Sequence, residues 1–190
     1  MSFEEQEGSS SQFPPSWHTS AEGSSDCLKG SNPVTANLHR SQADISSDFK
    51  LEFGHHQGRT SSVWHGGAAT IVQSPGDEVW GIVWKMNTSN LSSLDKQEGV
   101  EDGIYVPIEV NVHTQAGEVL TCRSYQMKDC VCGSPSPQYK KVICMGAKQN
   151  GLPADYQKKL EAIETNNYAG PVPIMEEIEP LDIMCILKTH

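Results

Sequence analysis

The sequence predicts an α+β domain, built mainly of antiparallel strands with a few short helices, between two flexible ends. Three observations support this class: apolar and polar residues alternate from Asp48 onward, turn residues recur at hairpin spacing, and helix-start signatures occur near residues 137 and 153. At 190 residues the chain has the length of one domain, enough to bury a core without disulfides or metal ions.

The N-terminal segment, residues 1–47, is predicted to be disordered. Serine fills 12 of its 47 positions, and its apolar residues occur singly, with no period of 2 or 3.6. Such a segment has no face to bury, so ordering it would cost more free energy than packing returns.

The strands are expected in the following part of the chain, the predicted domain of residues 48–168. A Pro-Gly turn at residues 74–77 between two apolar runs indicates a hairpin, and residues 114–117 join a second strand pair. Five strands are predicted, at residues 49–53, 68–72, 79–84, 104–112 and 119–127.

The first predicted helix is short and ends beside a carboxylate. Asn87 or Thr88 can cap its start, and Gly99 offers a left-handed stop. Glu98 therefore falls in the last turn, where the negative end of the helix dipole disfavours a carboxylate.

Two longer helices and a tail complete the chain. One helix is predicted from Pro137 to about Ala147, with Ser136 as its cap, and the next from Pro153 to about Ile163. Residues 169–190, rich in proline and acidic residues, are predicted to form a mostly flexible tail.

Composition excludes several classes of protein. The net charge is −10, with 14 basic and 24 acidic residues, so a basic nucleic-acid-binding face is not expected. No apolar run approaches the length of a membrane span, and the acidic N-terminus does not resemble a signal peptide. We therefore expect a cytosolic protein whose six cysteines are free thiols. They are Cys27, Cys122, Cys130, Cys132, Cys144 and Cys185.

The residues alone indicate no metal site, no cofactor and no covalent nucleophile. His55, His56 and His65 form the only local histidine cluster, and adjacent histidines on a strand point to opposite faces. Neither a Gly-x-Ser-x-Gly elbow nor a phosphate-binding Gly-x-x-x-x-Gly-Lys loop occurs. By pattern alone, Glu98 is a solvated helix-end acid and Tyr139 a surface tyrosine.

Several strings resemble the gamma-glutamylcyclotransferase family, nearly continuously from Asp48 to about Ile163. They are Ser74-Pro-Gly-Asp-Glu-Val-Trp-Gly81, Val83-Trp-Lys-Met-Asn87, Gln97-Glu-Gly-Val100, Thr121-Cys-Arg-Ser-Tyr125, Pro135-Ser-Pro-Gln-Tyr-Lys-Lys141, Ile143-Cys-Met-Gly-Ala-Lys148 and Asn150-Gly-Leu-Pro153.

The resemblance implies a small mixed β-barrel with flanking helices, assembled as a homodimer. The reaction it implies is cyclisation of a γ-glutamyl amino acid to 5-oxoproline, releasing the free amino acid without a cofactor. Glu98 matches the family's general base and acid, and Tyr139 matches its substrate-binding phenol.

The N-terminal segment departs from the family, in which Tyr-Gly-Ser-Asn-Leu follows a hydrophobic first strand. Gly30-Ser31-Asn32 is flanked by Lys29 and Pro33, and Gly23-Ser24 keeps less of the motif. The first strand and the substrate loop are therefore expected to be missing or altered. Two functions remain open: the cyclisation itself, or a non-catalytic binding protein that keeps the fold.

Overall fold

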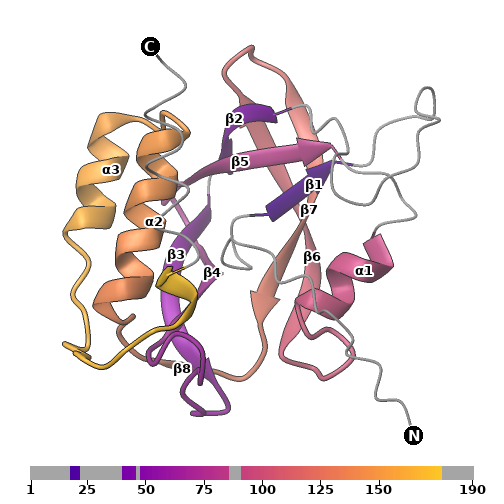
Figure 1. The fold of residues 1–190 in the computed structure, drawn as a ribbon. Helices are drawn as coiled ribbons and strands as arrows, with labels where there is room; N and C mark the ends of the chain where they lie inside the picture. The colour runs from indigo at the N-terminus through magenta and orange to yellow at the C-terminus, as the bar shows by residue number, and fades with distance from the viewer. Residues whose placement is uncertain (1–17, 22–39, 46–47, 86–90, 177–190) are drawn as a thin grey trace, which may run out of the picture.

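The computed structural model describes residues 18–21, 40–45, 48–85 and 91–176, arranged as two sheets with helices at either side (Figure 1). The larger sheet has the strand order β1-β5-β2-β6-β7. These strands are β1 (His18–Ala21), β2 (Arg40–Ile45), β5 (Val79–Lys85), β6 (Tyr105–Thr114) and β7 (Val119–Met127).

The larger sheet is mixed, because β1 runs parallel to β5 while the other pairs are antiparallel. β1 also pairs with β7, through Ser20 opposite Arg123 and Ala21 opposite Cys122. The first and the last strand of this order are therefore neighbours as well. The mixed sheet and the flanking helices of the predicted fold are thus confirmed.

The smaller sheet has the order β4-β3-β8 and lies beside the helices α2 and α3 in Figure 1. Its strands are β3 (Asp48–His56), β4 (Ala68–Ser74) and β8 (Cys130–Cys132), all antiparallel. β8 was not predicted, since three residues are too few to show a period.

The helices lie at opposite sides of the sheets. α2 (Pro137–Gln149) and α3 (Ala154–Glu161) pack together on one side, and α1 (Leu91–Gln97) lies on the other, near β6 (Figure 1). The predicted start of α2 is confirmed: the Ser136 hydroxyl accepts a hydrogen bond from the Tyr139 amide at 3.2 Å, and Pro137 opens the helix.

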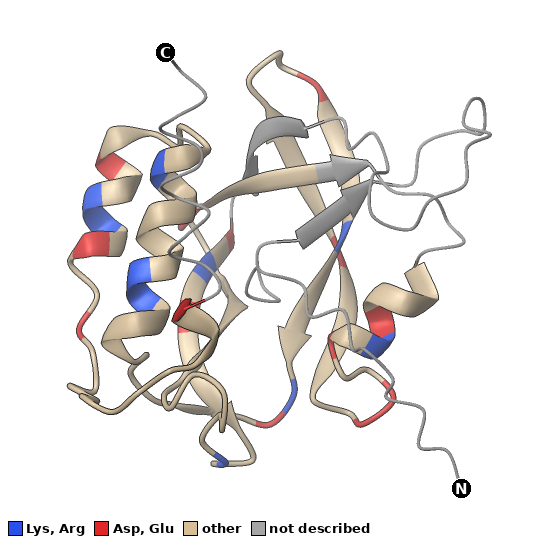
Figure 2. Cartoon of the chain, viewed as in Figure 1, with Lys and Arg blue, Asp and Glu red and all other residues tan. Residues whose placement is uncertain are grey.

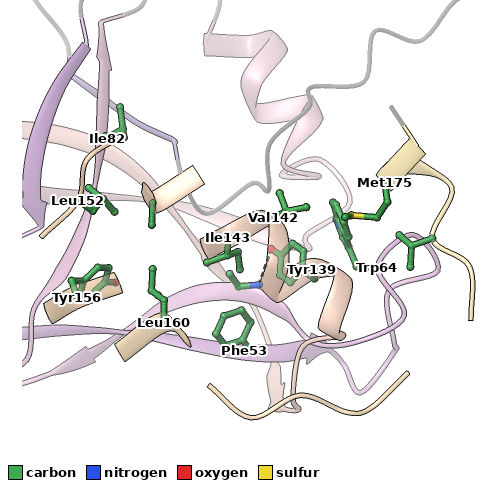
Figure 3. Packing of buried hydrophobic residues seen from close by; sticks show 13 residues of the cluster. Phe53, Trp64, Ile82, Tyr139, Val142, Ile143, Leu152, Tyr156, Leu160 and Met175 are labelled. Carbon is green, nitrogen blue, oxygen red and sulfur yellow. Dashed lines mark hydrogen bonds between the residues drawn. The ribbon is translucent and has the colours of Figure 1, made fainter. Parts of the chain in front are cut away.

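The main core joins α2 and α3 to the smaller sheet. Phe53 of β3 and Ile143 of α2 lie within it, as Figure 3 shows. A second group, Leu94, Tyr105, Tyr125 and Met127, packs α1 against β6 and β7. Burial of these apolar surfaces is the main favourable term for the fold.

The predicted hairpin at residues 74–77 is wrong as a strand pairing. The turn itself forms, with Asp77 N donating to Ser74 O at 3.1 Å and Gly76 at φ +85°. However, β4 pairs with β3, whereas β5 belongs to the larger sheet. Turn chemistry is local, but each strand takes the partner that completes its backbone hydrogen bonds.

Parts of the two ends that were predicted to be flexible belong to strands or to the core. Residues 18–21 and 40–45 form β1 and β2, stabilised by backbone pairing that needs no apolar period. In the tail, Val172 and Met175 are buried in the main core. Residues 1–17, 22–39, 46–47 and 177–190, which include Gly23-Ser24 and Gly30-Ser31-Asn32, lie outside the described residues.

The described surface carries charges of both signs. Figure 2 shows basic and acidic residues close together on α3. No helix in the described ranges is both long and apolar enough to cross a membrane.

Candidate active site

Glu98 is the most unusual polar residue in the described structure. It follows the last residue of α1, and its amide donates to Leu94 O at 2.9 Å, which continues the helical bonding by one residue. Gly99, at φ +67°, then reverses the chain, as a helix-ending glycine does. The side chain is only 2% exposed, and neither carboxylate oxygen has a hydrogen-bond partner within the described residues.

The environment of Glu98 favours its protonated form. Burial, and to a smaller extent the negative charge of Asp95, raise the pKa of this carboxyl from an ordinary 4.5 to about 8. The position just beyond the C-terminus of α1 acts in the same direction. Glu98 can therefore gain or lose a proton near neutral pH, as a general acid or base must.

Asp95 lies three residues before Glu98 and is held in a defined place. Its two oxygens accept from Arg123 Nη2, each at 2.8 Å, and one accepts from Tyr125 Oη at 2.6 Å. Arg123 Nε also donates to Tyr125 Oη at 3.2 Å. These bonds tie α1 to β7, which positions the helix end that carries Glu98.

Tyr139 is not the surface residue that its pattern indicated, since it is 0% exposed. Its phenol oxygen accepts from Ala69 N at 3.2 Å, the hydrogen bond drawn dashed in Figure 3. Its ring lies 4.8 Å from that of Trp64 and meets Phe53 edge-on at 6.2 Å. These contacts hold both the ring and the oxygen of Tyr139 in place.

Tyr105 connects the two predicted site residues. Its hydroxyl donates to Ala69 O at 2.9 Å, so the phenols of Tyr105 and Tyr139 bind the two polar groups of Ala69. The pKa of Tyr105 is raised by burial first, then by the charges of Tyr139 and Glu98. Tyr105 is therefore within electrostatic reach of both residues, and the three belong to one region of the molecule.

Residues 166–168, which follow α3, contact His65, the neighbour of Trp64. His65 adopts a left-handed φ of 54°, and its ring stacks on Tyr168 at 4.4 Å and 10°. The Asn166 side-chain amide donates to His65 O at 2.7 Å. These two contacts hold His65 in place next to Trp64, whose ring packs on Tyr139.

The sequence patterns did not identify Asp95, Tyr105, Arg123 or Tyr125 as site residues. One signal was present: Arg123 and Tyr125 are two apart on a strand and so share a face. That Asp95 meets them could not be expected, because it lies on a separate helix.

The side chains of His55, His56 and His65 make separate contacts and do not form a metal-binding group within the described ranges. His55 and His56 end β3, and the His56 Nδ1–H donates to Lys128 O at 2.7 Å, whereas His65 stacks on Tyr168. Within the described ranges, no three His, Cys, Asp or Glu side chains are placed to hold a metal ion.

Comparison with known proteins shows extensive similarity. The model of the AIG2-like family matches residues 78–160. The gamma-glutamylcyclotransferase of Bos taurus is 61% identical over 168 residues, covering 85% of this chain and 88% of that protein. The gamma-glutamylcyclotransferase of Homo sapiens is 59% identical, covering 80% of this chain and 84% of that protein.

Solved structures agree with these relatives. A gamma-glutamyl cyclotransferase structure, 59% identical, superposes with a TM-score of 0.72 and covers 76% of this chain and 86% of that one. A Bacillus subtilis protein, YkqA, is 21% identical with a TM-score of 0.55, which shows a shared fold alone. From identity of about 60% over most of both chains, together with the shared fold, it follows that this chain belongs to the gamma-glutamylcyclotransferase family.

Proposed function

We propose that this protein cyclises γ-glutamyl amino acids to 5-oxoproline and releases the free amino acid, with Glu98 as general base and then general acid. One observation carries the assignment of Glu98: a carboxyl that is 2% exposed, without a hydrogen-bond partner among the described residues, and with its pKa raised to about 8. Relatives at about 60% identity named as this enzyme support the reaction and disfavour a non-catalytic binding role.

The reaction suits a site with a single proton-transferring carboxyl group. The substrate carries its own nucleophile, because its α-amino group can close a five-membered ring on the γ-carbonyl. Orientation within the site therefore supplies much of the acceleration, and no covalent enzyme nucleophile is needed. The enzyme has to move two protons, one at a time, from the α-ammonium to the departing amine.

Glu98 is matched to these protons. An α-ammonium next to a peptide bond ordinarily has a pKa of about 8, and the free α-carboxylate of a γ-glutamyl group raises that pKa. With its own pKa at about 8, Glu98 is a much closer match to this ammonium than an ordinary carboxylate would be. The ionised carboxylate accepts one proton from the ammonium, and the free amine attacks the γ-carbonyl carbon. Glu98 returns this proton to the departing nitrogen as the C–N bond to the leaving amino acid breaks. The ring nitrogen then gives up its surplus proton to Glu98, which passes it to the released amine, so the amino acid leaves as an ammonium and the ring nitrogen keeps one hydrogen. Bond formation and bond breaking balance, and the carboxyl ends in its starting state.

Tyr139 is proposed to contact the substrate with its phenol. Its oxygen is held by Ala69 N, and its ring by Trp64 and Phe53, so the group is preorganised without substrate. Preorganisation of this kind lowers the entropy lost on binding. Replacing Tyr139 with phenylalanine should raise KM more than it lowers kcat, while an unchanged KM would contradict the role.

The substrate loop is assigned by its distance from β1. Gly23-Ser24 begins two residues after Ala21, the end of β1, whereas Gly30-Ser31-Asn32 begins nine residues after it. Since the family places its loop directly after the first strand, we favour Gly23-Ser24. Gly23→Val should then reduce kcat/KM far more than Gly30→Val, and the reverse order would assign the loop to Gly30.

Four finer properties belong to the same proposal. The β1–β7 pairing supports a closed five-stranded barrel. Catalysis independent of metal ions follows from the proton-transfer mechanism and is tested with chelators. A homodimer, as the resemblance implies, is tested by light scattering, and a cytosolic location by fractionation.

The assay for the whole proposal is release of 5-oxoproline from a γ-glutamyl dipeptide by the purified chain. We expect turnover by the parent protein and a loss of at least about a hundredfold in Glu98→Gln. A folded parent protein that binds the dipeptide without forming 5-oxoproline would instead support the non-catalytic role.

A further inference from the structure

The short strand β8 presents two thiols on one face. Cys130 and Cys132 are two residues apart, so in a strand their side chains point to the same side. Both are free thiols; Cys130 is partly buried and Cys132 is exposed. The proposed cyclisation uses neither of them.

The neighbouring strand leaves room for the Cys130 sulfur, because a glycine lies beneath it. Gly54 of β3 lies opposite Cys132, and His56 lies opposite Cys130. A Cβ built on Gly54 would overlap the Cys130 sulfur and approach Val131 O to 2.7 Å. The sulfur of Cys130 therefore occupies the space that any other residue at position 54 would fill, on the side of the ladder shared with Cys132.

The two sulfurs also interact electrostatically. The pKa of the Cys130 thiol is raised by burial first and then by the negative charge of Cys132. The pKa of Lys50 is raised mainly by its hydrogen bond and charge interaction with Glu52, and to a smaller extent by Cys132. Lys50, paired with Glu52, is thus within electrostatic range of Cys132.

We propose that Cys132 and Cys130 form a redox-active dithiol site that reacts with low-molecular-weight disulfides. The Cys132 thiolate attacks one sulfur of the small disulfide, forms a mixed disulfide and releases the first small thiol. Cys130 then loses its proton to water and attacks the Cys132 sulfur. The products are a Cys130–Cys132 disulfide and a second small thiol, so the protein loses two hydrogens and the small disulfide gains them.

The geometry makes this disulfide readily reversible. Residues two apart in an extended strand have Cα atoms about 6.7 Å apart, near the upper limit of about 6.8 Å for a disulfide. The bridge therefore bends β8, and strained disulfides are the more easily reduced ones. An excess of small thiol should restore both cysteines.

Peptide mapping tests the proposal directly. Cleavage after Lys128 and Lys140 releases residues 129–140, which contain Cys130 and Cys132 but no other cysteine. The folded full chain is treated with hydroxyethyl disulfide, alkylated and digested, and the masses of its peptides are measured by mass spectrometry. This probe has no γ-glutamyl group, so the outcome is independent of whether the protein cyclises such substrates.

The expected result is an internal disulfide, seen as loss of two hydrogens from this peptide and reversed by excess thiol. Cys130→Ser should instead accumulate the mixed disulfide at Cys132, and Cys132→Ser should lose most of the reaction. Cys144, a partly buried single thiol on α2, serves as the reference. The proposal is overturned if the parent protein stops at the mixed disulfide, if the bridge resists excess thiol, or if Cys132 reacts no faster than Cys144.

Discussion

Replacing Glu98 with glutamine removes an ionisable group from a site where its charged form is disfavoured, and the cost of that charge can be measured. In the unfolded chain this carboxyl titrates near 4.5, and in the folded protein near 8. At about 1.4 kcal/mol per pKa unit the difference corresponds to about 5 kcal/mol. Glutamine keeps the size of the side chain but carries no charge at any pH.

The sign of the effect follows from proton binding. Between pH 4.5 and about 8 the folded protein retains a proton on Glu98 that the unfolded chain has lost. The free energy of unfolding of the parent protein should therefore fall by up to about 1.4 kcal/mol per pH unit from this group as pH rises. Below pH 4.5 this loss is absent, and above about pH 8 it is complete.

The assay is urea unfolding of the parent and Glu98→Gln at several pH values from 4 to 9. The difference in unfolding free energy between the two should increase with pH in favour of Glu98→Gln, because the other titrating groups are common to both. Glu101→Gln, a change at an exposed acid three residues further on, is the matched control and should show no such trend. Parallel curves for the parent and Glu98→Gln would refute the reasoning that burial raises the Glu98 pKa.

Activity separates the catalytic role from the stability effect. Glu98→Gln should remain folded, yet lose at least about a hundredfold in kcat, because the amide cannot accept the proton. If the variant still forms 5-oxoproline at more than about a tenth of the parent rate, the general base is another group.

Further predictions concern the surroundings of Glu98 and the core. The kcat/KM of the parent protein should rise with pH up to a limit set by the Glu98 pKa of about 8, and Asp95→Asn should move that limit to lower pH by removing a negative charge. Lys96→Gln, at an exposed position on the same helix, should leave the profile in place, so equal profiles for all three proteins would contradict the coupling. Trp64→Ala should destabilise the fold by about 3–5 kcal/mol in urea unfolding, since it opens a cavity in the main core, whereas a cost below about 1 kcal/mol would show that the core collapses around it. Met175→Ala should cost about 2–5 kcal/mol, and unchanged stability would mean that the tail does not pack into the main core.

The sequence by itself determined the local elements from Asp48 onward. Period-2 alternation located β3, β6 and β7, and the Ser136-Pro137 cap located the start of α2, because strand faces and helix ends are set by neighbouring residues. The residues matching the family motif also singled out Glu98 and Tyr139, whose roles stay proposals. None of these inferences required knowing which elements meet in space.

Only the tertiary structure decided pairing and burial. The turn at residues 74–77 is local, yet β4 pairs with β3 while β5 pairs with β2, since partners are chosen across the whole chain. Ten residues of the serine-rich segment form strands for the same reason: backbone groups pair without an apolar pattern. Glu98 is buried because α1 packs its end against β6 and β7, which excludes water from a carboxylate that its own helix would leave exposed.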